Sequence, residues 1–161
     1  MATLITDARL KVVAEGPVIA VKQPDRLLAN MDDWNQKTHG ESGLVARVKA
    51  STVETQEAER QTLDFLRQYV VAGSSPMCGN SIHQDRRFLE REMPELWAFP
   101  LPQPGCLDRQ RAGQALEPGA LAGFKKQNAH LAMDDIKESI AELAHYRRTF
   151  LRVEEGSDEE E

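Results

Sequence analysis

The chain has 161 residues, of which 40% are apolar, and a formal net charge of −6. This length fits one ordinary domain, and the apolar content is enough for a core but too low for a membrane protein. No apolar run approaches the roughly 20 residues of a membrane span, and the first residues lack the basic and apolar regions of a secretion signal. We therefore expect a cytoplasmic protein with no membrane partner.

The negative charge is concentrated at one end of the chain. Residues 154–161 include six acidic residues and no basic one, which accounts for the whole net charge and leaves residues 1–153 close to neutral. Such a charge run is typical of a disordered, solvated tail. A near-neutral body lacks the basic surface that long duplex nucleic acid requires, but it is compatible with a small anionic substrate. We accordingly divide the chain into a domain at 1–153 and an acidic tail at 154–161.

The first half of the chain changes from strand patterns to helix patterns. Residues 2–23 contain two β-rich stretches with turn-like breaks, which predicts two neighbouring antiparallel strands. Helical periodicity then predicts a short helix over 42–50 and a longer one over 53–71, which Gly73 and Pro76 should end.

The second half contains one irregular segment between further regular elements. Residues 76–82 are small and mostly apolar and predict a short buried strand, and a helix should follow through 85–93. An apolar stripe predicts a last helix over 133–151, with Asp134 and Asp135 at its N-terminal end, where the dipole favours anions. Between 99 and 123, four prolines and four glycines interrupt every period and predict a long loop. Strands interleaved with helices indicate an α/β domain with a mixed sheet.

Three clusters contain residues typical of a catalytic site. They are MDDWNQKTHGESGL at 31–44, CGNSIHQDRRFLEREMPEL at 78–96 and HLAMDDIKESIAELAHYR at 130–147. In this order and at these separations they resemble the oligoribonuclease family, part of the DEDD group of 3′-to-5′ exonucleases. The resemblance covers about residues 2–97, resumes at 124 and continues to the acidic tail. It implies a ribonuclease H-like mixed sheet flanked by helices.

The resemblance also implies a two-metal hydrolysis of phosphodiesters. Asp85 and Asp135 would be two of the four acidic ligands for two divalent ions, Mg²⁺ or Mn²⁺, which lie roughly 3.5 to 4 Å apart in such sites. His130 would be the general base that takes a proton from the attacking water, a role that neutral histidine performs near pH 7.

Substrate recognition is implied for three more residues. Trp34 would stack on a splayed base, a contact worth about 1–3 kcal/mol and tolerant of sequence. His39 and Ser81 would donate hydrogen bonds to a terminal phosphate, which would favour short oligoribonucleotides as substrates. The family resemblance further implies a homodimer.

Each of these residues also has an ordinary structural interpretation. Trp34 could be a half-buried core aromatic. His39 could end a turn with Gly40, and Ser81 could cap the helix that follows. Asp85 could be a solvated helix residue, and a histidine and an aspartate five residues apart occur by chance in many proteins.

The chain departs from the family in two places. The family's first motif, Asp-x-Glu on a central strand, has no counterpart in this sequence, so two of the four metal-binding carboxylates and that strand are missing. Residues 100–118, read one nucleotide later with free codon choice, can spell a strand and helix like those of the family, within an irregular segment at 100–123. We interpret this segment as an out-of-frame insert that replaces a tyrosine, an arginine and a serine that contact the phosphate, the tyrosine from the second subunit.

The predicted function is that of a metal-dependent 3′-to-5′ exoribonuclease that degrades short oligoribonucleotides to mononucleotides, with impaired activity in this chain. An alternative is a non-catalytic remnant of the fold that binds nucleotides or interacts with another subunit. A third possibility, DNA or tRNA ends as substrate, is disfavoured because the segment from Trp34 to His39 resembles short-RNA enzymes in particular.

Overall fold

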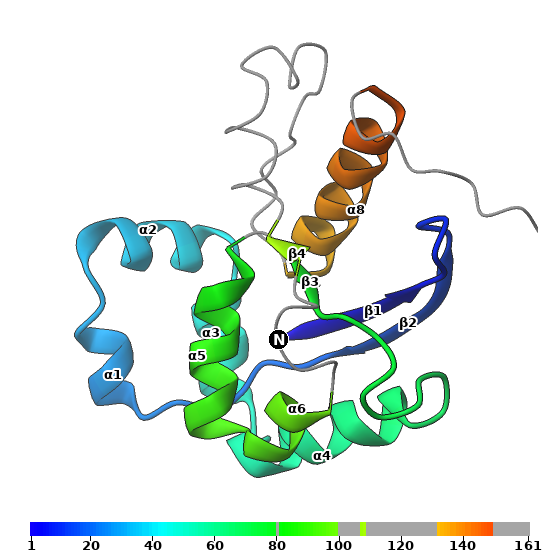
Figure 1. Ribbon diagram of the computed structural model, residues 1–161. Helices are drawn as coiled ribbons and strands as arrows, with labels where there is room; N and C mark the ends of the chain where they lie inside the picture. The colour runs from blue at the N-terminus through cyan, green and yellow to red at the C-terminus, as the bar shows by residue number, and fades with distance from the viewer. Residues whose placement is uncertain (80, 100–106, 109–131, 150–161) are drawn as a thin grey trace, which may run out of the picture.

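The computed structural model describes residues 1–79, 81–99, 107–108 and 132–149 of the chain (Figure 1). These residues form helices around a β-hairpin and a second, very short strand pair. The expected catalytic base at position 130, most of the proline-rich segment and the acidic tail lie outside the described residues.

The predicted pair of antiparallel strands is confirmed. Strand β1 (Ala2–Thr6) pairs with β2 (Val12–Val18), with Ala2 opposite Val18 and Thr6 opposite Val12. The turn between them is stabilised by the Asp7 carboxylate, whose Oδ1 accepts hydrogen bonds from the backbone N–H of Arg9 and of Lys11, both at 2.9 Å.

Three helices follow the hairpin and form a unit that we call the helical arm, residues 22–53. They are α1 (Asp25–Ala29), α2 (Asp33–Glu41) and α3 (Leu44–Ala50). The short helix predicted over 42–50 is confirmed as α3, whereas α1 and α2 were not predicted because their sequences show no sustained apolar stripe. Figure 1 shows α1 and α2 at one side of the molecule, away from the hairpin.

Helix α4 (Thr55–Leu66) supplies the centre of the core. Its buried Ala58 and Leu63 join apolar side chains from the end of the hairpin, α5 and α6. The buried core residues are Ile19, Ala58, Leu63, Leu89, Met93 and Leu96. The helix predicted over 53–71 exists but ends earlier, at Leu66, where the chain enters turns before the exposed Val71.

The contact between α4 and β2 is close enough to require a glycine. A Cβ atom on Gly16 would lie 2.6 Å from Cε1 of Phe65, which is shorter than any ordinary carbon contact. Because Gly16 has no side chain, the Phe65 ring lies directly on β2, and the hairpin packs closely against α4.

The middle of the chain forms a strand, two helices and a second strand. Strand β3 (Cys78–Gly79) is followed by α5 (Ile82–Glu92) and α6 (Pro94–Ala98), and β3 pairs in parallel with β4 (Leu107–Asp108). The prediction of a buried strand over 76–82 was wrong in two respects, because β3 has two residues and Cys78 is exposed. The prediction of a loop throughout 99–123 was wrong at β4, because strand pairing between distant segments leaves no local signal.

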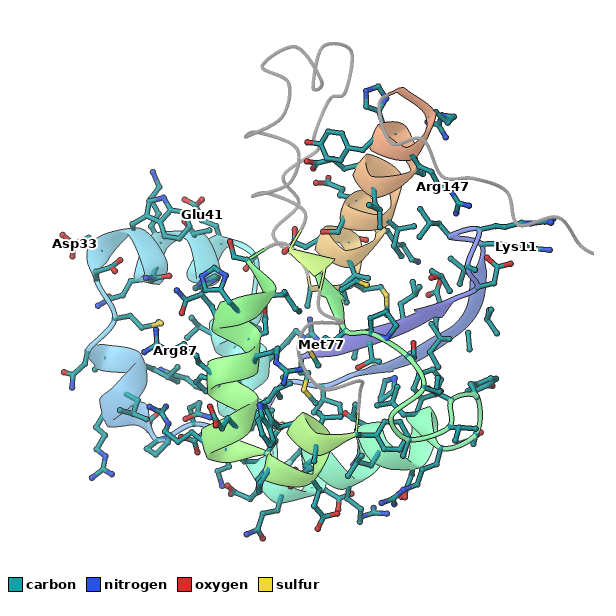
Figure 2. All side chains as sticks on the ribbon, viewed as in Figure 1. Lys11, Asp33, Glu41, Met77, Arg87 and Arg147 are labelled. Atoms are coloured by element: carbon teal, nitrogen blue, oxygen red, sulfur yellow. The ribbon has the colours of Figure 1, made fainter. Side chains whose placement is uncertain are left out.

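Helix α8 (Ala132–Thr149) confirms the helix predicted over 133–151 and packs against β1. Lys137 Nζ lies 2.8 Å from Glu15 Oε1 of β2, and Arg147 Nη1 donates a hydrogen bond to the backbone oxygen of Ala8. Figure 2 accordingly shows Arg147 beside the tip of the hairpin, where Lys11 lies. The last helix is therefore attached to the first two strands.

The arrangement confirms the predicted α/β class. The described strands form two separate pairs, one antiparallel and one parallel. Among the described helices, every one is too short or too polar to span a membrane.

Candidate active site

Helix α2 presents two of the expected substrate-binding residues together. Trp34 is 63% exposed, and its ring centroid lies 6.3 Å from that of His39 in an edge-on arrangement with an interplanar angle of 80°. This exposure excludes the interpretation of Trp34 as a half-buried core aromatic, and the position of His39 within α2 excludes its interpretation as a turn terminator. His39 Nδ1 is buried and has no hydrogen-bond partner in the described part of the chain.

Ser81 occupies the position before the first residue of α5 in a strained conformation. Its φ of 54° and ψ of 35° lie in the left-handed region, which a residue other than glycine adopts at a cost of about 1–3 kcal/mol. The helix begins without a capping hydrogen bond from the Ser81 side chain. Backbone strain of this kind concentrates at binding sites, which favours a functional role for Ser81 over the capping interpretation.

Asp85 lies in the first turn of α5. Partial burial of its carboxyl raises the pKa of Asp85 above the ordinary value, while a backbone hydrogen bond and the nearby His83 act in the opposite direction. The residue still has an exposed surface. A carboxylate in such a place is stabilised by a nearby cation, since a positive charge favours its ionised form.

Asp135 lies in the first turn of α8 and is exposed, and Asp134 beside it is half-buried. The backbone oxygen of Asp135 accepts a hydrogen bond of 2.7 Å from Ser139 Oγ one turn further along. The placement of both aspartates at the start of the helix confirms that part of the sequence prediction.

The metal centre is not assembled from the described residues alone. Within 1–79, 81–99, 107–108 and 132–149, no group of three or more histidine, cysteine, aspartate or glutamate side chains could hold a metal ion. Asp85 and Asp135 therefore do not fit a two-metal centre by themselves. His130 falls outside the described residues, so the expected convergence of Asp85, His130 and Asp135 stays a prediction.

Two buried charged residues, in α5 and α4, were not predicted from the sequence. Arg86 is 7% exposed, and its guanidinium carbon lies 5.6 Å from the ring centroid of Trp97 in α6. Glu59 of α4 is 9% exposed and accepts hydrogen bonds from the backbone N–H of Glu95 and of Leu96, at 2.9 and 3.0 Å. Neither contact has a local sequence signal, because each joins segments that are separate in the chain.

Comparison with known proteins identifies the family. The family model described as "Exonuclease" matches residues 1–143. The oligoribonuclease of Pectobacterium atrosepticum is 56% identical over 154 residues, covering 95% of this chain and 86% of the relative. The chain belongs to the oligoribonuclease family.

Further members of the oligoribonuclease family match to the same extent. The oligoribonuclease of Escherichia coli strain K12 is 56% identical over 154 residues, covering 95% of this chain and 85% of the relative. That of Alcanivorax borkumensis is 57% identical over 152 residues, covering 94% and 84%. Family membership confirms the predicted hydrolase class and 3′-to-5′ exoribonuclease function.

Proposed function

We propose that this oligoribonuclease domain acts on short oligoribonucleotides in the cytoplasm, as a metal-dependent homodimer, and releases mononucleotides from the 3′ end. The observation that carries the proposal is the 56% identity over 154 residues to proteins named oligoribonuclease. The exposed Trp34 beside His39 supports it, because an accessible ring at this position can stack on an unpaired base.

Recognition of the substrate is assigned to one aromatic and two polar residues. Trp34 stacks on the base, and His39 and Ser81 bind the terminal phosphate. The edge-on contact between the rings of Trp34 and His39 supports this assignment, because both side chains belong to one helix that has no buried residue. A pocket for a terminal phosphate excludes long RNA, which would place a continuing chain there.

Catalysis is assigned to Asp85 and Asp135 as ligands of a divalent cation, Mg²⁺ or Mn²⁺, and to His130 as the general base. Such a cation activates water and stabilises the leaving oxygen when it is bound. Two carboxylates supply too little negative charge to hold two divalent ions close together. We therefore expect the 161-residue polypeptide, made alone, to have little activity.

An RNA cleavage assay tests this expectation. A 5′-labelled RNA of about five nucleotides, chosen to match the short substrates that stacking sites accept, is incubated with the polypeptide and excess Mn²⁺ or Mg²⁺. The RNA should stay largely intact, and efficient stepwise release of mononucleotides would contradict the expected impairment.

Any residual activity should also show the direction of cleavage and the dependence on Asp85 that the proposed mechanism requires. It should shorten the RNA from its 3′ end and disappear in Asp85→Asn, because this change removes one ligand charge. The matched control is Asp25→Asn, which alters the first-turn aspartate of α1 and should have no effect. Residual activity that persists in Asp85→Asn would show that Asp85 is not a ligand.

The incomplete set of carboxylates in the described residues favours one alternative, a non-catalytic protein that binds nucleotides or another subunit. Both functions predict binding, but only the first predicts cleavage when metal is supplied. Tight binding of a short RNA with no product at high enzyme concentration would favour the alternative. Preferential binding of DNA or of long RNA would contradict the proposed substrate class.

A further inference from the structure

The helical arm is attached to the core without a buried side chain of its own. Every residue from 22 to 53 is described, and none is buried. A backbone hydrogen bond of 2.8 Å from Lys22 N to Val53 O closes the base of the arm. Val53 at the end of the arm packs against the core, and α2 contacts α3. Because no side chain of the arm is buried, local hydrogen bonds contribute to holding the first turn of α2.

Asp32 makes the largest set of these local bonds. Its Oδ1 accepts a hydrogen bond of 2.8 Å from the backbone N–H of Asn35, and its Oδ2 accepts one of 2.9 Å from Asn35 Nδ2. The backbone N–H of Trp34 also interacts with the Asp32 carboxylate. Asp32 thus caps the first turn of α2 through Trp34 and Asn35.

Gln36 links α2 to the end of the preceding helix through side-chain hydrogen bonds. Its Nε2 donates to the backbone oxygen of Met31 at 2.8 Å and to that of Ala29 at 3.4 Å. The side chain thereby ties the end of α1 to the first turn of α2. The segment from Ala29 to Gln36 is held by its own polar groups, and Trp34 projects from it into solvent.

We infer that Asp32 is a positioning residue for Trp34: its capping bonds fix the first turn of α2 and so set the orientation in which the Trp34 ring meets a base. The inference rests on the proposed function, in which Trp34 stacks on the substrate. A Trp34 ring that is already fixed in the free protein loses less conformational entropy when it binds a base than a ring on a frayed helix end. Asp32 therefore contributes to affinity for RNA without touching it.

Fluorescence in a Trp97→Phe background tests the inference, because the chain has two tryptophans and Trp34 alone then emits. Asp32→Ala should release the first turn of α2, so that the anisotropy of Trp34 decays faster in the free protein. Binding of a 5′-phosphorylated diribonucleotide, measured in EDTA to prevent cleavage, should weaken about five-fold, the usual cost of losing an N-cap. Asp32→Asn and Asp32→Ser, which can still cap, should restore both properties.

Two matched variants separate positioning from charge and from general stability. Asp33→Ala removes the same charge one residue further along α2. Asp7→Ala removes two comparable side-chain-to-backbone bonds in the distant hairpin turn. Neither should change the anisotropy of Trp34 or the affinity for the diribonucleotide, and far-ultraviolet circular dichroism checks that every variant is folded.

The possible results are distinguishable from failure of the proposed function. Unchanged Trp34 anisotropy in Asp32→Ala would overturn the inference, and so would an Asp32→Asn variant that behaves like Asp32→Ala, because the charge rather than the cap would then be responsible. If the parent emission does not respond to the diribonucleotide, the stacking role of Trp34 fails. In that case the anisotropy alone decides whether Asp32 orients the ring.

Discussion

At the scale of single residues, Ser81 and Leu10 both have backbone angles in the left-handed region, but they lie in different surroundings. Ser81 precedes α5 beside the expected metal ligand Asp85, whereas Leu10, with a φ of 66°, lies in the turn of the hairpin. Both pay the steric cost that an L side chain meets in this region. The strained backbone of Ser81 lies next to the candidate site, where we propose that the Ser81 hydroxyl binds the terminal phosphate.

We predict that Ser81→Gly stabilises the protein and weakens RNA binding. Glycine adopts a φ of 54° without the Cβ clash, which should raise the free energy of unfolding by about 1 kcal/mol. The lost hydroxyl should lower affinity for a 5′-phosphorylated diribonucleotide. Urea denaturation and a binding titration measure the two effects, with Leu10→Gly as the control that should leave binding intact. Equal binding by Ser81→Gly and the parent would remove Ser81 from the phosphate site.

The candidate site could be predicted in part from the sequence, for reasons visible at individual residues. Trp34 and His39 lie in one short segment, which predicts that they are near each other. A spacing of five residues does not put them on one face of a helix, so their ring contact could not be predicted. Asp32 also carried a signal, an N-cap residue followed by a polar segment, but the missing apolar stripe concealed α2. The contact of Glu59 with α6 could not be predicted, because it joins positions 36 and 37 residues apart.

At the scale of secondary-structure elements, α6 depends on a carboxylate from another helix. Its five residues, Pro94–Ala98, are too few for a stable isolated helix. Glu59 accepts the N–H groups of its first turn inside the protein, where they would otherwise lack partners. The ring of Trp97 then lies under Arg86 of α5. Glu59 thereby couples α4, α6 and α5.

We predict that Glu59→Ala destabilises the fold by about 2–4 kcal/mol, because two hydrogen bonds to a buried charged group are lost and two N–H groups are left unpaired. Glu59→Gln should cost less, since its amide oxygen still accepts. The matched control, Glu57→Ala, alters an exposed glutamate of the same helix and should shift the urea midpoint little. A Glu59→Ala variant as stable as Glu57→Ala would show that α6 is held by apolar packing alone.

The elements that the sequence predicts best are those with their own periodicity. The hairpin and helices α3, α5 and α8 follow their apolar patterns closely. The end of α4 was misplaced because apolar residues continue the pattern past Leu66, although the chain turns there. Strand β4 was missed because two residues pairing with a distant strand leave no periodic trace.

At the scale of the whole molecule, the negative charge is concentrated at one end of the sequence. Residues 1–153 are close to neutral, and residues 154–161 hold the net charge of −6. A sequence without a net positive charge gives little long-range attraction for phosphate, so the proposed binding of RNA would depend on stacking and on a small number of hydrogen bonds.

We predict a weak salt dependence for binding of a short oligoribonucleotide. With one terminal phosphate bound by His39 and Ser81, the logarithm of the association constant should fall against the logarithm of salt concentration with a slope no steeper than about −2. Titrations in EDTA at several potassium chloride concentrations measure the slope. A chain shortened to residue 153 is the control for repulsion by the tail. A much steeper slope in both chains would indicate that RNA contacts a basic surface, contrary to the proposed recognition by Trp34, His39 and Ser81.

The backbone bond between Lys22 and Val53 has a consequence for the evolution of the domain. It brings the entry and the exit of the helical arm side by side, so the length and sequence between them can change while the hairpin and α4 keep their places. None of the arm's residues is buried, although Val53 at its end packs against the core, so an exchange of the segment between Lys22 and Val53 removes no buried core side chain. Changes of length or sequence in the arm are thus compatible with an unchanged hairpin and α4.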